Sequence, residues 1–172
     1  MLDFAVLGLL MERARHGYEL KRALAELGFW KVSFGSLYPS LRRLEKRGAI
    51  SAVSGTGRRK AYQITDEGHE IFDALLRADP DASETERAFQ IRLAFLGHLP
   101  RERRVQVLEG RRAKLSTNLK AAREILIDAR SNTENQDRYR LALMEHAMAT
   151  TESDIAWLDG LVAAERGVAS QN

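Results

Sequence analysis

Basic side chains gather in one short part of the chain, between residues 31 and 60. The whole chain of 172 residues has a formal net charge of only +3. This segment alone holds a single acid, Glu45, and eight basic residues: Lys31, Arg42, Arg43, Lys46, Arg47, Arg58, Arg59 and Lys60. A cluster of one sign is typical of a surface that binds a polyanion, because lysine and arginine donate hydrogen bonds to phosphate oxygens. The segment therefore predicts a polyanionic partner.

The middle of this segment predicts an amphipathic helix that begins at Ser36 or just before it and ends at Gly48. Its apolar side carries leucines at helical spacing, namely Leu37, Leu41 and Leu44. A rotation of about 100° per residue puts another set opposite or beside them: Tyr38, Pro39, Arg42, Arg43 and Lys46. We expect the leucines to be buried and the other side to face the partner. For the basic residues the alternative is a merely solvated face, and for Tyr38 it is partial packing in the core.

The elements around this helix indicate how it is presented. Two helices are predicted before it, over residues 2–13 and 18–27, and a β-hairpin after it, with strands 49–54 and 61–65 around a basic, glycine-rich turn. A further helix begins at Thr65. Three short helices and a hairpin with a basic tip form a winged helix-turn-helix. The major groove of B-DNA is about 12 Å wide and admits one helix, so the basic helix is expected to bind there.

The second half of the chain predicts a helical, coiled-coil-like domain. Residues 78–84 have the composition of a linker, so we expect a DNA-binding domain over 1–78 and a helical domain over 79–172. Apolar residues then recur at alternating spacings of three and four from Val105 to Ala129 and again from Leu141 to Val162, with Arg112 and Thr151 as the polar exceptions. These heptad seams favour a dimer, which a symmetric operator requires. A helical hairpin within one monomer is the alternative.

Three motifs of the first half resemble the signature of the PadR family of bacterial transcriptional regulators. They read HGYEL at 16–20, FGSLYPSLRRLEKRGAI at 34–50 and RRKAYQITDEG at 58–68. The second half is similar to the helical domain of the same family in AFQIRLAFLGHLP at 88–100 and ESDIAWLDGLVAAE at 152–165. The resemblance implies a homodimeric repressor. Its winged helix would bind a palindromic operator in duplex DNA, its C-terminal helices would form the dimer, and a small molecule would release it from DNA.

The helix pattern and the resemblance together give two sets of candidate site residues. The DNA contacts are expected at Ser36, Tyr38, Pro39, Arg42, Arg43, Lys46, Arg58, Arg59 and Lys60. A pocket for a planar apolar effector is expected at Trp157, Phe95 and Phe89, since aromatic faces suit flat ligands. Ordinary interface core is the alternative for these three. Tyr18 and Trp30 are expected to pack between helices.

Other classes of function find little support in the composition. The chain has no cysteine, and its four histidines are scattered, so no metal site and no cofactor are expected. No arrangement of a nucleophile with a base stands out, so we do not expect an enzyme. The apolar run Phe4–Met11 is too short to span a bilayer, and a cytoplasmic protein without a signal peptide is expected. The remaining alternative is a winged-helix module that binds protein instead of DNA.

Overall fold

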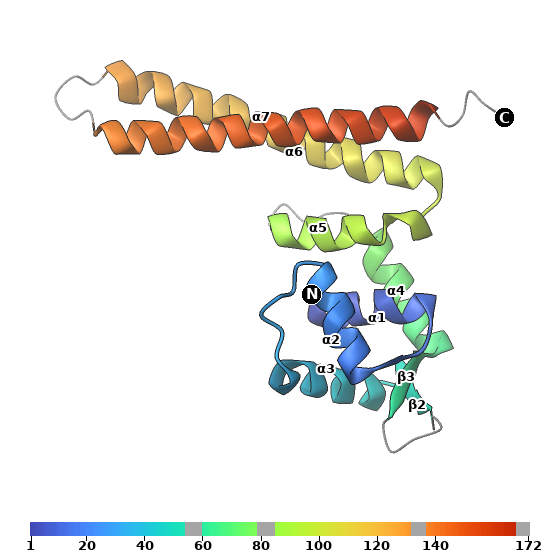
Figure 1. Ribbon diagram of the computed structural model, residues 1–172. Coiled ribbons are helices and arrows are strands. Elements are labelled where there is room, and N and C mark those ends of the chain that lie inside the picture. Colours follow the sequence, from blue (N-terminus) through green and yellow to red (C-terminus); the bar gives the residue numbers. More distant parts are fainter. Residues whose placement is uncertain (54–59, 79–84, 132–136, 168–172) are drawn as a thin grey trace. The chain divides into compact units, whose positions relative to one another are not determined.

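The structure is a computed structural model that describes residues 1–53, 60–78, 85–131 and 137–167. It divides into two compact units, residues 1–99 and 100–172. The first contains α1 (Leu2–Glu12), β1 (Arg15–His16), α2 (Gly17–Glu26), α3 (Phe34–Lys46), β2 (Ile50–Val53), β3 (Ala61–Ile64), α4 (Asp66–Arg77), α5 (Glu86–Ala94) and the 3-10 helix η1 (Leu96–His98). The second contains α6 (Arg101–Ser131) and α7 (Arg138–Gly167) (Figure 1). The mainly helical fold with a small sheet was predicted. The domain boundary after residue 78 stays a prediction.

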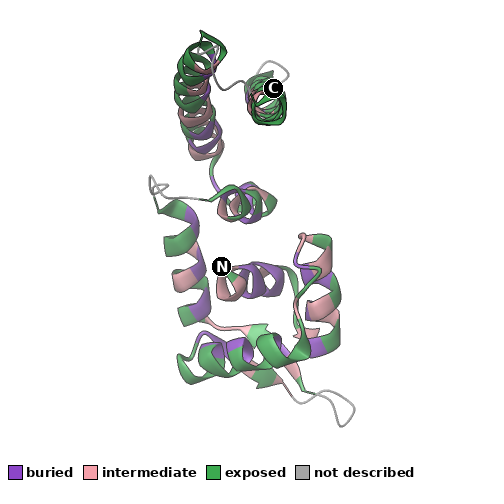
Figure 2. Cartoon of the chain, turned by 90° about the vertical axis from the view of Figure 1, so that its left-hand side faces the viewer, coloured by how far each residue is buried: buried purple, intermediate pink, exposed green. Residues whose placement is uncertain are grey.

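The core of the first unit forms around α1. Its residues from Ala5 to Leu10 are all buried, and it packs against α2, α3, α4 and β3. A helix whose middle is apolar on every side must be enclosed by other elements, and Figure 2 shows a large part of α1 in the colour of buried residues. Helices α2, α3 and α4 therefore share α1 as the centre of their hydrophobic core.

Local signals in the sequence set both ends of α3. The Ser33 hydroxyl accepts a hydrogen bond from the Ser36 amide at 3.2 Å, which caps the first turn. At the other end Gly48 takes a positive φ of 72°, and the amides of Gly48 and Ala49 return to the carbonyls of Glu45 and Leu44. The helix begins two residues before the predicted Ser36, so Pro39 lies in its second turn and not in its first.

The sheet has one strand more than the predicted hairpin. Its order is β1-β3-β2, and both pairings are antiparallel, with Arg15 opposite Tyr62 and Ile50 opposite Ile64. Strand β1 has only two residues, which is too short for an alternating pattern to reveal. It joins the segment before α2 to the base of the wing.

Helix α5 belongs to the first unit through an aromatic contact. The Phe95 ring is buried and meets Phe4 and Phe72 edge-on, with centroids 5.7 Å apart in both pairs. A β-carbon added to Gly8 of α1 would lie 2.5 Å from the tip of that ring. The absence of a side chain at Gly8 therefore creates the seat for Phe95.

In the second unit the two predicted heptad seams pack against each other within one chain. Helices α6 and α7 are antiparallel, and buried seam residues come from both: Leu108, Leu119, Leu126, Leu158 and Val162. Ion pairs cross between the helices along their length: Arg104–Glu165, Glu109–Arg166, Arg112–Asp159, Arg123–Glu152 and Arg130–Glu145. The two seams thus pack on each other within one chain, as in a helical hairpin. No helix among the described residues is both long and apolar enough to cross a membrane.

Candidate nucleic-acid interface

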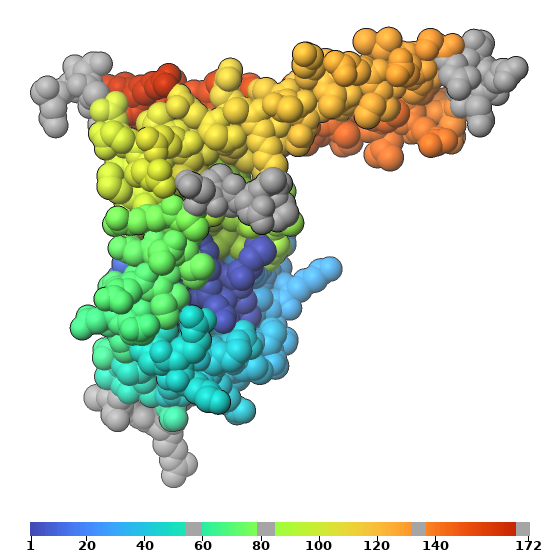
Figure 3. All heavy atoms as spheres, turned by 180° about the vertical axis from the view of Figure 1, so that it is seen from behind, coloured from blue at the N-terminus to red at the C-terminus, as the bar shows by residue number. Residues whose placement is uncertain are grey.

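Helix α3 has the two faces that its sequence predicts. Leu37, Leu41 and Leu44 have no exposed surface, and they turn toward the core beside the buried Ser40. The predicted DNA contacts of this helix are all exposed: Ser36, Tyr38, Pro39, Arg42, Arg43 and Lys46. In Figure 3 the atoms of α3 and β2, in cyan to turquoise, form an open surface of the first unit. The wing residue Lys60 is exposed too, whereas Arg58 and Arg59 lie outside the described residues.

The hydroxyl of Ser36 is already used within the helix. It donates to the Ser33 carbonyl at 2.9 Å, while the Ser36 amide donates to the Ser33 side chain. The hydroxyl could donate to a phosphate only after its hydrogen bond to the Ser33 carbonyl is broken. Ser36 therefore acts first as part of the start of α3.

Tyr38 combines the two alternatives that the sequence left open. Its side chain is 43% exposed, and its ring stacks on Phe34 with centroids 5.8 Å apart. The hydroxyl points to the first residue of α2, because a β-carbon on Gly17 would lie 3.2 Å from it. Lys21 of α2 lies over the Phe34 ring, 4.5 Å from its centroid. Tyr38 is thus both a packing residue and part of the surface.

A hollow of about 490 Å³ lies between the start of α2, the start of α3 and strand β3. It is lined by His16, Gly17, Tyr18, Phe34, Tyr38, Lys60 and Tyr62. Tyr18 and Trp30 are predicted to pack between helices, but they are 53% and 81% exposed. Tyr18 stacks on His16, and the two residues are the third and the first of the motif HGYEL. That motif was the available signal for this hollow.

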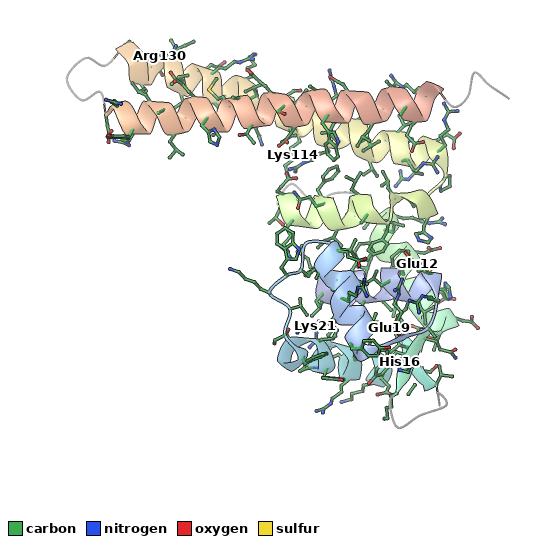
Figure 4. The ribbon with its side chains drawn as sticks, in the orientation of Figure 1. Glu12, His16, Glu19, Lys21, Lys114 and Arg130 are labelled. Carbon is green, nitrogen blue, oxygen red and sulfur yellow. The ribbon has the colours of Figure 1, made fainter. Side chains whose placement is uncertain are left out.

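The start of α2 is held by a reciprocal pair of hydrogen bonds. The His16 amide donates to the Glu19 carboxylate at 2.7 Å, and the His16 side chain accepts from the Glu19 amide. The bond from His16 lowers the pKa of the Glu19 carboxyl, and the neighbouring Arg13 contributes to the same shift. Figure 4 labels His16, Glu19 and Lys21 at this end of the helix. The cap fixes His16 and Tyr18 at the rim of the hollow.

The cations of this surface fall into two groups. Arg43 donates to the Asp3 carboxylate of α1 at 2.8 Å. Over the described ranges, no ion pair involves Arg42, Lys46 or Lys60. The unpaired cations extend from α3 to the base of the wing, which gives the surface a positive charge that internal carboxylates do not offset.

The three predicted effector residues do not share one environment. Phe89 and Phe95 lie in the first unit and are buried, whereas Trp157 lies in the second and is 50% exposed. An apolar groove of about 250 Å³ runs between α6 and α7 and contains none of them. Its lining comes from both helices: Asn118, Leu119, Ala122, Ile125, Met144, Ala147, Met148 and Thr151.

Each half of the chain matches the model of a known protein family. The model of the transcriptional regulator PadR-like family matches residues 6–74, and the model described as the C-terminal part of virulence activator alpha matches residues 87–164. The negative transcriptional regulator PadR of Bacillus subtilis (strain 168) is 27% identical over 175 residues, which cover 95% of this chain and 96% of that protein.

Solved structures with a similar course of the chain include several regulators. Bacillus subtilis PadR in complex with operator DNA is 22% identical, covers 95% of this chain and 98% of its own, and gives a TM-score of 0.43. The same protein in complex with p-coumaric acid is 22% identical with 96% and 98% coverage and a TM-score of 0.44. A PadR-like regulator of Bacillus cereus is 23% identical with 97% and 99% coverage and a TM-score of 0.41.

Proposed function

We propose that this chain, which belongs to the PadR-like family of transcriptional regulators, is a homodimeric repressor that binds a two-fold operator in duplex DNA. The observation that carries the proposal is a set of exposed cations on α3 and the wing base, Arg42, Lys46 and Lys60, none of which forms an ion pair with another described residue. Repression is inferred from the Bacillus subtilis relative, a negative regulator that matches almost the whole chain. The protein would act in the cytoplasm, where such DNA is found, and it needs no catalytic group.

In this proposal α3 enters the major groove. Its buried leucines fix the helix on α1, so the opposite face with Tyr38, Pro39, Arg42 and Lys46 meets the base edges and the phosphates. A good bidentate contact from arginine to guanine contributes about 1–3 kcal/mol of discrimination. Arg42 is the candidate for this contact because it has the required donors and no carboxylate partner in the described residues.

The hollow at the start of α2 is proposed to receive the DNA backbone. Its rim carries the hydrogen-bond donors of Lys60, Tyr18 and Tyr38 together with the His16 ring. Arg58 and Arg59, which precede β3 in the sequence and lie outside the described residues, are proposed to contact further phosphates. Contacts of this kind position a protein on DNA and carry no sequence information. They should also make the affinity strongly dependent on salt.

The dimer is proposed to form through the second unit. The α6–α7 hairpin leaves large apolar side chains exposed in a single chain, at Ile125, Ile127, Leu143 and Trp157. Exposed apolar patches mark surfaces that a partner covers, and a second copy is the partner that a two-fold operator requires. The two copies of α3 would then contact half-sites about 34 Å apart, one helical turn of DNA.

Fluorescence anisotropy with a labelled random-sequence duplex tests DNA binding directly. We expect affinity for this duplex that falls steeply between about 50 and 200 mM salt. Lys60→Ala should weaken binding to all sequences alike and lower the salt slope by about one unit per bound subunit. Arg42→Ala should in addition relax the sequence preference found by selection from a random pool. A protein that ignores duplex DNA at low salt would instead support the protein-binding winged helix.

Relief of repression by a small planar apolar molecule is the second part of the proposal. Trp157 is half-exposed in the unit proposed to form the dimer, and the apolar groove beside Met144 and Met148 offers room for such a ligand. A ligand that binds the DNA-incompetent arrangement tenfold better shifts the equilibrium by about 1.4 kcal/mol. A panel of planar aromatic compounds should change Trp157 fluorescence and release the labelled duplex. If no compound does either, this part of the proposal fails while DNA binding stands.

A further inference from the structure

One carboxylate of α1 binds two side chains of the DNA-facing helix. Oδ1 of Asp3 accepts a hydrogen bond from the Ser40 hydroxyl at 2.5 Å and another from Nη2 of Arg43 at 2.8 Å. Ser40 has no exposed surface, and the Asp3 side chain is 30% exposed. The bonds join residues 37 and 40 positions apart in the sequence. They form a polar link between the central helix of the core and α3.

The sequence positions of the three residues explain the link. Ser40 and Arg43 are three residues apart, so they lie on the same side of α3, one turn from each other. Asp3 lies in the first turn of α1, where the helix dipole favours a negative charge. One carboxylate can therefore accept from both donors while the helices pack through their apolar sides.

The link separates Arg43 from the other cations of the surface. A guanidinium that donates to a carboxylate at 2.8 Å has its charge offset locally, and the donor in that bond is no longer available to a phosphate. Arg42 is the next residue along the helix and has no such partner over the described ranges. Two adjacent arginines of the motif LRRLEK thus have different surroundings, although their sequence positions look equivalent.

We propose that Asp3 is a positioning residue for DNA recognition. It pairs with the guanidinium of Arg43 at the surface and, through the buried Ser40, fixes the rotation of α3 about its axis. Reading of the DNA then falls to Arg42 and Lys46. This inference rests on the proposed function, and it replaces the sequence-based expectation that Arg43 contacts DNA.

The test uses full-length Asp3→Asn, Arg43→Ala and the double variant, with salt-dependent binding of the random-sequence duplex as readout. Asn at position 3 can still accept from Ser40, but it no longer offsets the charge of Arg43. We expect Asp3→Asn to steepen the salt slope by about one unit per subunit, as a freed guanidinium gains a phosphate. Arg43→Ala should leave the slope unchanged, and the double variant should behave like Arg43→Ala.

Controls separate this effect from simple loss of an acid and from loss of structure. Asp73→Asn removes an acid of the same unit that pairs with Arg77 within α4, and it should not change the slope. Arg42→Ala should flatten the slope. If Arg43→Ala flattens it equally, or if Asp3→Asn steepens it in the absence of Arg43, the inference is wrong.

A second measurement tests the Asp3–Arg43 interaction by itself, without DNA, so that its failure is distinguishable from a failure of DNA binding. Urea midpoints of the two single variants and the double variant form a cycle that reports the Asp3–Arg43 interaction itself. We expect the shift of the double variant to be smaller than the sum of the single shifts. Additive midpoints would mean that the two side chains do not interact in solution, and the positioning role would be refuted.

Discussion

Tyr62 is a residue whose titration should report on the base of the wing. Its ring is buried in β3 opposite Arg15, and burial raises the pKa of the Tyr62 phenol, with a further contribution from the Glu45 carboxylate. The native state therefore retains this proton to a higher pH than the unfolded chain. The resulting stability is complete below about pH 10, the ordinary value for tyrosine, and is lost as pH rises through the folded pKa.

We therefore expect the free energy of unfolding, measured with urea between about pH 8 and 11, to fall at the alkaline end. In Tyr62→Phe that part of the fall should be missing. Tyr139→Phe is the matched control, because the Tyr139 ring is 76% exposed on α7. If the control flattens the alkaline fall as much as Tyr62→Phe does, Tyr62 is not its source.

At the scale of the elements, α1 contacts the segment after α5 at Gly8, which has no side chain. In Gly8→Ala the new methyl group would lie 2.5–2.7 Å from three atoms of the Phe95 ring, which is enclosed by Phe4 and Phe72. The ring must move, so we expect a loss of about 1–3 kcal/mol in the free energy of unfolding. Thermal and urea unfolding measure it.

A shorter side chain at position 95 should relieve this clash. The variant Gly8→Ala with Phe95→Leu should therefore lose less stability than the sum of its single changes. Gly110→Ala provides the control, because a β-carbon there meets nothing within 4 Å and alanine favours the interior of α6 by about 0.5–1 kcal/mol. Strict additivity at positions 8 and 95 would show that the two residues do not share a contact.

Most elements could be predicted from sequence because their signals are local. The leucine spacing of α3, the glycine at its end and the threonine cap of α4 act within a few residues, and the structure agrees with them. Strand β1 was missed because its two residues owe their conformation to pairing with β3, a partner more than forty residues away.

The candidate site was predictable only in its outline. Helical spacing correctly indicated which side chains of α3 are exposed, but it could not distinguish Arg42 from Arg43. That distinction depends on Asp3, which approaches α3 only when α1 is packed in the core. The hollow beside Tyr18 likewise combines three segments that no local pattern relates.

For the whole molecule, the strongest expectation concerns helix α7. The buried residues of α6 pack against this helix, where Leu158 and Val162 are also buried. The ion pairs between the two helices likewise need the acids and bases of α7. Deleting residues 139–172 should expose the apolar side of α6 and yield monomers or aggregates. Light scattering distinguishes these products from a dimer. A truncated protein that remains a soluble dimer would show that the dimer contact lies elsewhere.

The seat of Phe95 also bears on how hybrid regulators should be built. The family model of the second half begins at residue 87, inside α5, whereas the first compact unit extends to Leu99. The boundary of the family match therefore differs from the boundary between the two compact units. A chimera joined near residue 85 would receive a foreign α5 that lacks a matching partner for Gly8. A junction between Leu99 and Pro100 keeps Gly8 and Phe95 in the same parent protein. We therefore expect more folded chimeras when the second units of relatives are exchanged at this junction.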